Sequence, residues 1–187
     1  MELFEAIQAG DGERVRALVA ADPRLANARN DDGLTAVLFA KYRLESEIAD
    51  ELVAAGAELD VFGAAATGRL DVLSDLLAAD DSLAGARTPD GFTALHYAAY
   101  FADGPTVDAL LQAGADPSAV AQNPMRVQPL HSAASARNLE GARLLLAAGA
   151  DPNAEQQDGY LPLDSAIQND DQAMQELLRS HGARASR

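Results

Sequence analysis

Residues 90–116 have the sequence DGFTALHYAAYFADGPTVDALLQAGAD, and this stretch decides the fold. A turn at residues 90–91 precedes a short apolar helix that opens at Thr93. A second helix ends at Leu111 and is followed by GAD at residues 114–116, where glycine is typical of a helix end. Two short helices cannot bury their own apolar face, so such a unit is stable only when it stacks on others like it.

Related stretches recur along the chain at two levels. Weaker copies of the unit occupy residues 32–58, 127–151 and 158–184. In addition, residues 2–58 match residues 60–116 at a constant offset of 58, with 22 of 57 positions identical. The simplest account is the duplication of a segment that holds two such units.

The unit resembles the ankyrin repeat, which opens with D-G-x-T-P-L-H-x-A-A and closes with L-L-x-x-G-A-D. His96 and His131 stand where this pattern places histidine, and four Gly-Ala pairs stand where it closes: Gly56-Ala57, Gly114-Ala115, Gly149-Ala150 and Gly182-Ala183. The resemblance implies an all-α solenoid of about six stacked helix-turn-helix repeats, joined by short β-turn loops called fingers. We expect one array over residues 1–187, with repeats at approximately 1–29, 30–59, 60–87, 88–120, 121–155 and 156–187.

One finger is expected to be missing. Between Gly56 and Phe62 the chain has about nine residues fewer than the family spacing requires. The third repeat therefore starts almost directly after the second. This gap in the row of fingers falls at the junction of the two duplicated segments.

The composition excludes several functions. The formal net charge is −15 and no basic stripe occurs, so we expect no nucleic acid partner. The excess of acidic residues is explained by the solubility that a high net charge provides, although selection for a basic partner remains an alternative. Cysteine is absent, which excludes disulfides, thiolate catalysis and cysteine-based metal sites. No signal segment or membrane-length apolar run is visible, so we expect a monomeric cytoplasmic protein.

The histidines raise the question of catalysis or metal binding. In the ankyrin family, histidine at the positions of His96 and His131 bonds to nearby turn backbone and fixes one repeat on the next. A zinc site would need three or four converging ligands, and no nucleophile elbow or phosphate-binding loop occurs. We therefore expect no catalytic residue, metal or cofactor. The alternative is a small-molecule or metal-dependent enzyme that uses these histidines and nearby aspartates.

The resemblance places function on the concave face, which fingers and inner helices form. The candidate partner-binding residues there are Phe39, Tyr42, Arg43, Tyr97, Tyr100, Phe101, Ser132 and Ser135. Five of the nine aromatic residues belong to this set, and Tyr and Arg commonly anchor protein interfaces. We predict a non-catalytic module that binds a protein or peptide. The aromatic residues could instead pack against fingers, and a purely structural role in stabilising a neighbouring protein stays open.

The predicted site has an expected geometry. Tyr97 and Tyr100 are three residues apart on one helix and should share a face. Tyr42 lies two repeats earlier, which would place it on the order of 20 Å from them. We expect these rings to be partly exposed in the free protein.

Overall fold

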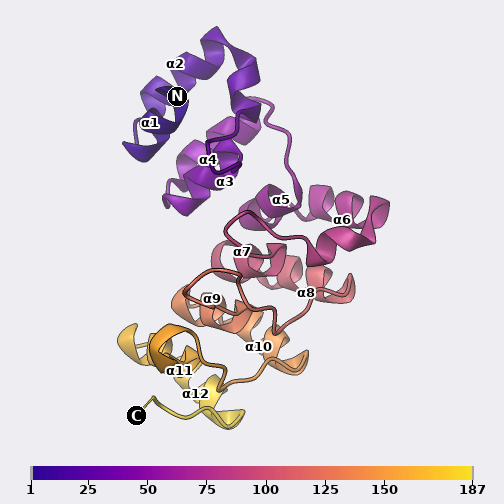
Figure 1. The fold of residues 1–187 in the computed structure, drawn as a ribbon, viewed down its shortest axis with the longest axis vertical. Helices are drawn as coiled ribbons and strands as arrows, with labels where there is room; N and C mark the ends of the chain where they lie inside the picture. The colour runs from indigo at the N-terminus through magenta and orange to yellow at the C-terminus, as the bar shows by residue number, and fades with distance from the viewer. Residues whose placement is uncertain (1, 187) are drawn as a thin grey trace.

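The computed structural model describes residues 2–186 and shows an elongated stack of paired helices (Figure 1). This part of the chain forms twelve α-helices and no β-strand. The inner helices of the six pairs are α1 (Glu2–Gln8), α3 (Ala36–Tyr42), α5 (Val61–Thr67), α7 (Ala94–Phe101), α9 (Pro129–Ser135) and α11 (Pro162–Gln168). The outer helices are α2 (Gly12–Ala21), α4 (Ser46–Ala54), α6 (Leu70–Ala79), α8 (Gly104–Gln112), α10 (Leu139–Ala147) and α12 (Gln172–Ser180). Three 3-10 turns complete the chain: η1 (Pro23–Asn27), η2 (Asp81–Gly85) and η3 (Gln157–Gly159).

The helices start and end where local chemistry requires. The Asp103 and Asn138 side chains accept hydrogen bonds from backbone N–H groups in the first turns of α8 and α10, at 3.2 and 2.8 Å. Such caps satisfy donors that a helix leaves free at its start. At the other end, Gly114 and Gly149 have φ angles of 88° and 95°. This left-handed conformation, which glycine adopts without a clash, ends α8 and α10.

Small side chains stack the inner helices and leucines pack the outer ones. Several alanines of α5, α7 and α9 are fully buried, which allows these helices to approach closely: Ala64, Ala65, Ala98, Ala99, Ala133 and Ala134. The outer helices contribute fully buried leucines such as Leu73, Leu110 and Leu145. Each pair thus supplies half of a core that only its neighbours complete.

The duplicated segments have the same structure. The bridge between Arg29 and Thr35 corresponds to the bridge between Arg87 and Thr93, again at an offset of 58. In both copies the guanidinium donates to the carbonyl of the turn glycine, Gly33 or Gly91, at 2.8 Å. The turns η1 and η2 are also equivalent, so the repeat seen in the sequence is a structural repeat.

The junction of the two segments lacks a finger, as expected. Only residues 55–60 connect α4 to α5, and Asp60 in this connection caps α5 through the N–H of Gly63 at 2.9 Å. Other successive outer helices pack on one another, whereas α4 and α6 make no comparable contact. The buried apolar residues accordingly form two clusters. One centres on α1–α4, and the other runs from Leu34 and Leu38 into α5–α12.

The helices of residues 2–186 are short. None of those described is long and apolar enough to cross a membrane.

Candidate functional site

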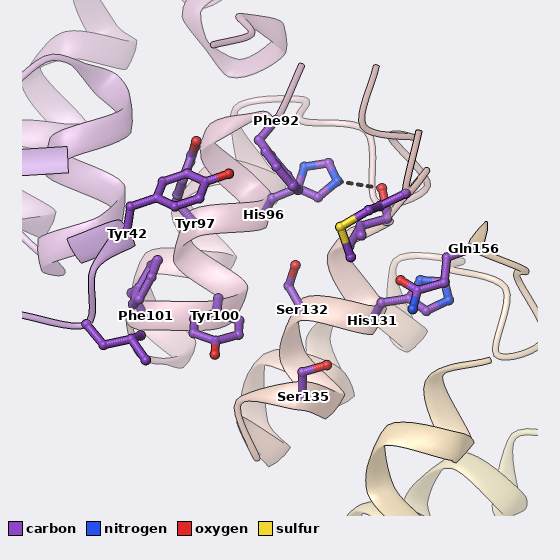
Figure 2. Close-up of a pocket in the computed structure, with 13 residues that line it drawn as sticks. Tyr42, Phe92, His96, Tyr97, Tyr100, Phe101, His131, Ser132, Ser135 and Gln156 are labelled. Carbon is purple, nitrogen blue, oxygen red and sulfur yellow. Dashed lines mark hydrogen bonds between the residues drawn. The ribbon is translucent and has the colours of Figure 1, made fainter. Parts of the chain in front are cut away.

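A groove of about 340 Å³ lies on the inner-helix side, between the end of α3 and the loop before α11. Figure 2 shows the side chains that surround it. We call it the aromatic groove, and its lining residues are Tyr42, Leu44, Phe92, His96, Tyr97, Tyr100, Phe101, Met125, Val127, His131, Ser132, Ser135 and Gln156. They come from α3, α7, α9 and four loops, so stacking of the repeats assembles the groove.

The first wall of the groove is a cluster of aromatic rings from two different repeats. The ring centre of Tyr42 lies 6.2 Å from that of Tyr97 and 6.4 Å from that of Phe92, both in edge-on arrangements. Phe92 and Tyr97 also contact each other, with their centres 5.9 Å apart. Edge-on and tilted contacts of this kind are favourable for aromatic rings. The expected separation of about 20 Å between Tyr42 and Tyr97 is therefore wrong.

Small residues in the intervening helix explain this close contact. The last residue of α3 is Tyr42, and the last residue of α5 is Thr67. At the place that Phe39 holds in α3, α5 has Ala64, which is fully buried. With small residues at these two positions of α5 and no finger before it, Tyr42 reaches across one layer to Tyr97.

A hydrogen bond also spans this junction. The Tyr42 hydroxyl donates to Oδ2 of Asp90 at 2.6 Å, and Oδ1 of Asp90 accepts from the Thr88 hydroxyl. Burial, followed by the hydrogen bond to Asp90, raises the pKa of Tyr42 well above its usual range. The phenol is therefore a neutral donor that ties the second repeat to the finger of the fourth.

The two tyrosines of α7 have different environments. Tyr97 is only 4 % exposed, and burial raises the pKa of its phenol. Our expectation that this ring would be partly exposed is wrong, because Tyr42, Phe62 and Phe92 pack around it. Tyr100 is 38 % exposed, as expected, and lies edge-on to Phe101 with ring centres 4.6 Å apart. Figure 2 shows Tyr100 and Phe101 at the opposite end of the groove from Phe92 and His96.

Comparison with known protein families agrees with this architecture. The family model for ankyrin repeats, which describes three copies of the repeat, matches residues 3–121 and again residues 61–156. The chain belongs to the ankyrin repeat family. A comparison with curated proteins gave no match. Ankyrin repeats are generally protein–protein interaction modules and typically lack enzymatic activity.

The two histidines of the ankyrin pattern hold one repeat on the next. Nε2 of His96 lies 3.0 Å from the carbonyl oxygen of Val127, which belongs to the following finger. His131 makes the same contact with the carbonyl oxygen of Tyr160 at 3.3 Å. Burial lowers the pKa of His96 to about 4 and also lowers the pKa of His131. Within residues 2–186, no group of three or more His, Cys, Asp or Glu side chains could hold a metal ion.

The remaining candidate residues of the ankyrin concave face fall into two groups. Ser132 and Ser135 line the groove; Ser132 is buried, and the exposed Ser135 shares a hydrogen bond of 3.1 Å with Ser165. Phe39 lies outside it, with its ring 5.4 Å from that of Phe4 in α1. Arg43 is exposed but does not line the groove. Phe39 is therefore a packing residue rather than part of the groove.

The structure adds lining residues that the sequence did not single out. Leu44 and Met125 are 66 % and 52 % exposed, and Phe92 and Gln156 come from fingers. The sequence offered one signal for Met125. It follows Asn123-Pro124, in a loop about two residues longer than the ankyrin spacing requires. Leu44 has a φ angle of 64°, which is unusual for leucine and had no sequence signal.

Proposed function

We propose that this ankyrin repeat protein binds a polypeptide partner in the aromatic groove and catalyses no reaction. The observation that carries the proposal is the gathering of exposed apolar side chains. Six large ones are exposed in the described part of the chain, and four of them line the groove: Tyr42, Leu44, Tyr100 and Met125. Single exposed apolar residues are ordinary, whereas a contiguous cluster is typical of an interaction site.

The groove offers anchoring contacts but little reactive chemistry. Its aromatic rings and flexible Leu44 and Met125 side chains can cover a large apolar group, as in the centres of protein interfaces. Both imidazoles are held by backbone atoms of the neighbouring loops. The Asp90 carboxylate accepts hydrogen bonds from Tyr42 and Thr88. These engaged groups favour binding over acid–base catalysis.

The proposal also covers the oligomeric state of the protein, its location in the cell and the class of its partner. We infer a monomer that acts in the cytoplasm, which the acidic, cysteine-free composition supports. The partner is a protein or peptide and neither nucleic acid nor membrane, since the net charge of −15 would repel both phosphate backbones and anionic lipid surfaces.

The test compares a groove variant with a matched surface variant. Met125→Asp and Tyr100→Asp place a charge in the groove, whereas Ile167→Asp places one at an exposed apolar position of α11 outside it. Partners are captured from the native host with the unmodified protein, and a purified partner is then titrated calorimetrically against each variant. Either groove substitution should weaken binding by at least about 2 kcal/mol, the scale of an interface hot spot. The proposal fails if Ile167→Asp weakens binding as much as the groove variants do.

A further inference from the structure

The charges around the aromatic groove define the chemistry of its partner. Resting on the function proposed above, we propose that the groove takes an apolar segment flanked on both sides by carboxylates. A protein with net charge −15 would be expected to favour a basic partner. The distribution of charge along the repeats points the other way.

Carboxylates are absent from the inner helices that form the groove. The sequences of α3, α5, α7 and α9 contain no Asp or Glu. The outer helices α2, α4, α6, α8, α10 and α12 each contain at least one. All thirteen lining residues are neutral, since the pKa of His96 is about 4 and that of His131 is lowered. The inner helices and the lining side chains thus carry no negative charge, and the carboxylates beside the groove belong to the adjoining loops, at Glu45, Asp90 and Glu155.

Two arginines stand beside the groove. Arg43 lies in sequence between Tyr42 and Leu44, and Arg126 lies between Met125 and Val127; all four neighbours line the groove. Both arginines are exposed. Arg43 comes from the end of α3 and Arg126 from the loop before α9, with α5 and α7 between them in the stack. Arg43 therefore lies on the α3 side of the groove, and Arg126 lies in the loop that precedes α9 on the other side of α7.

Neither guanidinium is bound to another group of residues 2–186. Most other arginines of residues 2–186 are paired with a carboxylate, as in Arg14, Arg16, Arg24, Arg29 and Arg143, or bound to backbone carbonyls, as in Arg87 and Arg137. Among the described residues, no hydrogen bond or ion pair is formed by the side chains of Arg43 and Arg126. Arg69, Arg179 and Arg184 also form no side-chain hydrogen bond or ion pair within residues 2–186, but none of them is a sequence neighbour of a lining residue, so Arg43 and Arg126 are the unpaired arginines next to the groove in sequence.

Screening by salt decides whether a partner responds to the arginines beside the groove or to the net charge of the whole protein. At physiological ionic strength, exposed charges more than about 8 Å apart hardly interact. Carboxylates of the outer helices then contribute little at the groove, whereas a partner carboxylate beside Arg43 or Arg126 gains a charge-assisted hydrogen bond. Asp90, the carboxylate nearest to Tyr42, already accepts two hydrogen bonds from this chain. Local recognition of acidic flanks therefore prevails over the net charge.

The experiment uses three synthetic peptides with blocked ends and a fluorescent label. The first has the core Leu-Leu-Phe-Leu with two glutamates on each side. The second replaces the glutamates with lysines, and the third replaces the core with serines. Binding is measured by fluorescence anisotropy at physiological salt with the unmodified protein, with Tyr100→Asp, and with the double variant Arg43→Glu/Arg126→Glu.

The glutamate-flanked apolar peptide should bind at least about tenfold more tightly than the lysine-flanked one. The double variant should reverse this preference, and neither the serine-core peptide nor Tyr100→Asp should give tight binding. A preference for lysine flanks, equal affinities for both apolar peptides, or no binding of either one would overturn the inference. Equal affinities that are both lost in Tyr100→Asp would leave the groove as the binding site. Binding that Tyr100→Asp leaves unchanged would instead refute the groove itself.

Discussion

Acid should weaken this protein through His96 before its carboxylates become protonated. His96 is 2 % exposed, and its Nδ1 accepts a hydrogen bond from the backbone N–H of Thr93 at 3.1 Å. Nε2 must therefore carry the proton that it donates to the carbonyl of Val127. Protonation of Nδ1 would remove the hydrogen bond from the Thr93 N–H, and burial disfavours the charged imidazolium, so the folded state resists protonation.

The size of the effect follows from the pKa. The pKa of His96 falls from 6.5, its ordinary value, to about 4 on folding. As pH falls through this window, the unfolded chain binds a proton that the folded chain does not, so the free energy of unfolding decreases. The loss should be about 2 kcal/mol by about pH 5 and about 3 kcal/mol below pH 4. The lowered pKa of His131 adds a loss in the same direction.

Urea unfolding at about pH 7.5 and about pH 5 measures this loss, with His96→Gln as the matched variant. Glutamine cannot titrate, so the variant should be less stable at the higher pH but should lose about 2 kcal/mol less on acidification. The carboxylates titrate alike in both proteins and cancel in the difference. If His96→Gln loses as much stability as the unmodified protein, the imidazole is not held neutral and the contact with Val127 is misassigned.

Three further comparisons of variants test the packing. Tyr42→Phe should cost about 1 kcal/mol because a half-exposed hydrogen bond to a carboxylate is lost; a double-mutant cycle with Asp90→Ala that shows no coupling would contradict this. Tyr97→Ala should cost about 3–5 kcal/mol as a core truncation and Tyr100→Ala about 1 kcal/mol or less, and equal urea midpoints would be inconsistent with the different burial of the two rings. Gly149→Val should cost more than about 1 kcal/mol and Gly149→Asn less, because φ is positive there; equal melting temperatures would place the helix end elsewhere.

Features that depend on local chemistry could be predicted from the sequence. The glycine at the end of α8 adopts the left-handed conformation that ends a helix. This conformation does not depend on the repeat that follows, so the sequence of the helix end is enough to predict it. The contacts of His96 and His131 with the next finger also follow from the repeat, since each unit offers the same carbonyl to its neighbour. Predicting the missing finger required only a count of the residues between Gly56 and Phe62.

The groove itself could not be predicted in the same way. Tyr42 can contact Tyr97 because α5, the helix between them, has small side chains along the path of the contact. In the sequence alone, each of these small side chains is explained by close helix packing and gives no sign of the contact. A comparison of aligned positions would have shown Thr67 where α3 has Tyr42, which is the signal that two tyrosines could meet. No such comparison would have found Leu44, which is exposed and lies in a turn with positive φ.

The two duplicated segments diverged where the missing finger changed their surroundings. Leu38 and His96 occupy equivalent positions, but the finger that would offer a carbonyl to residue 38 is absent. Leu38 instead lines a pocket of about 390 Å³ together with Val61 and Phe62, and the charged residues Arg29, Asp60 and Arg87 also line this pocket. A histidine there would be buried without the partner that His96 has, at a cost of about 1–3 kcal/mol. The absence of the finger therefore accounts both for leucine at position 38 and for the contact of Tyr42 with the rings of the aromatic groove.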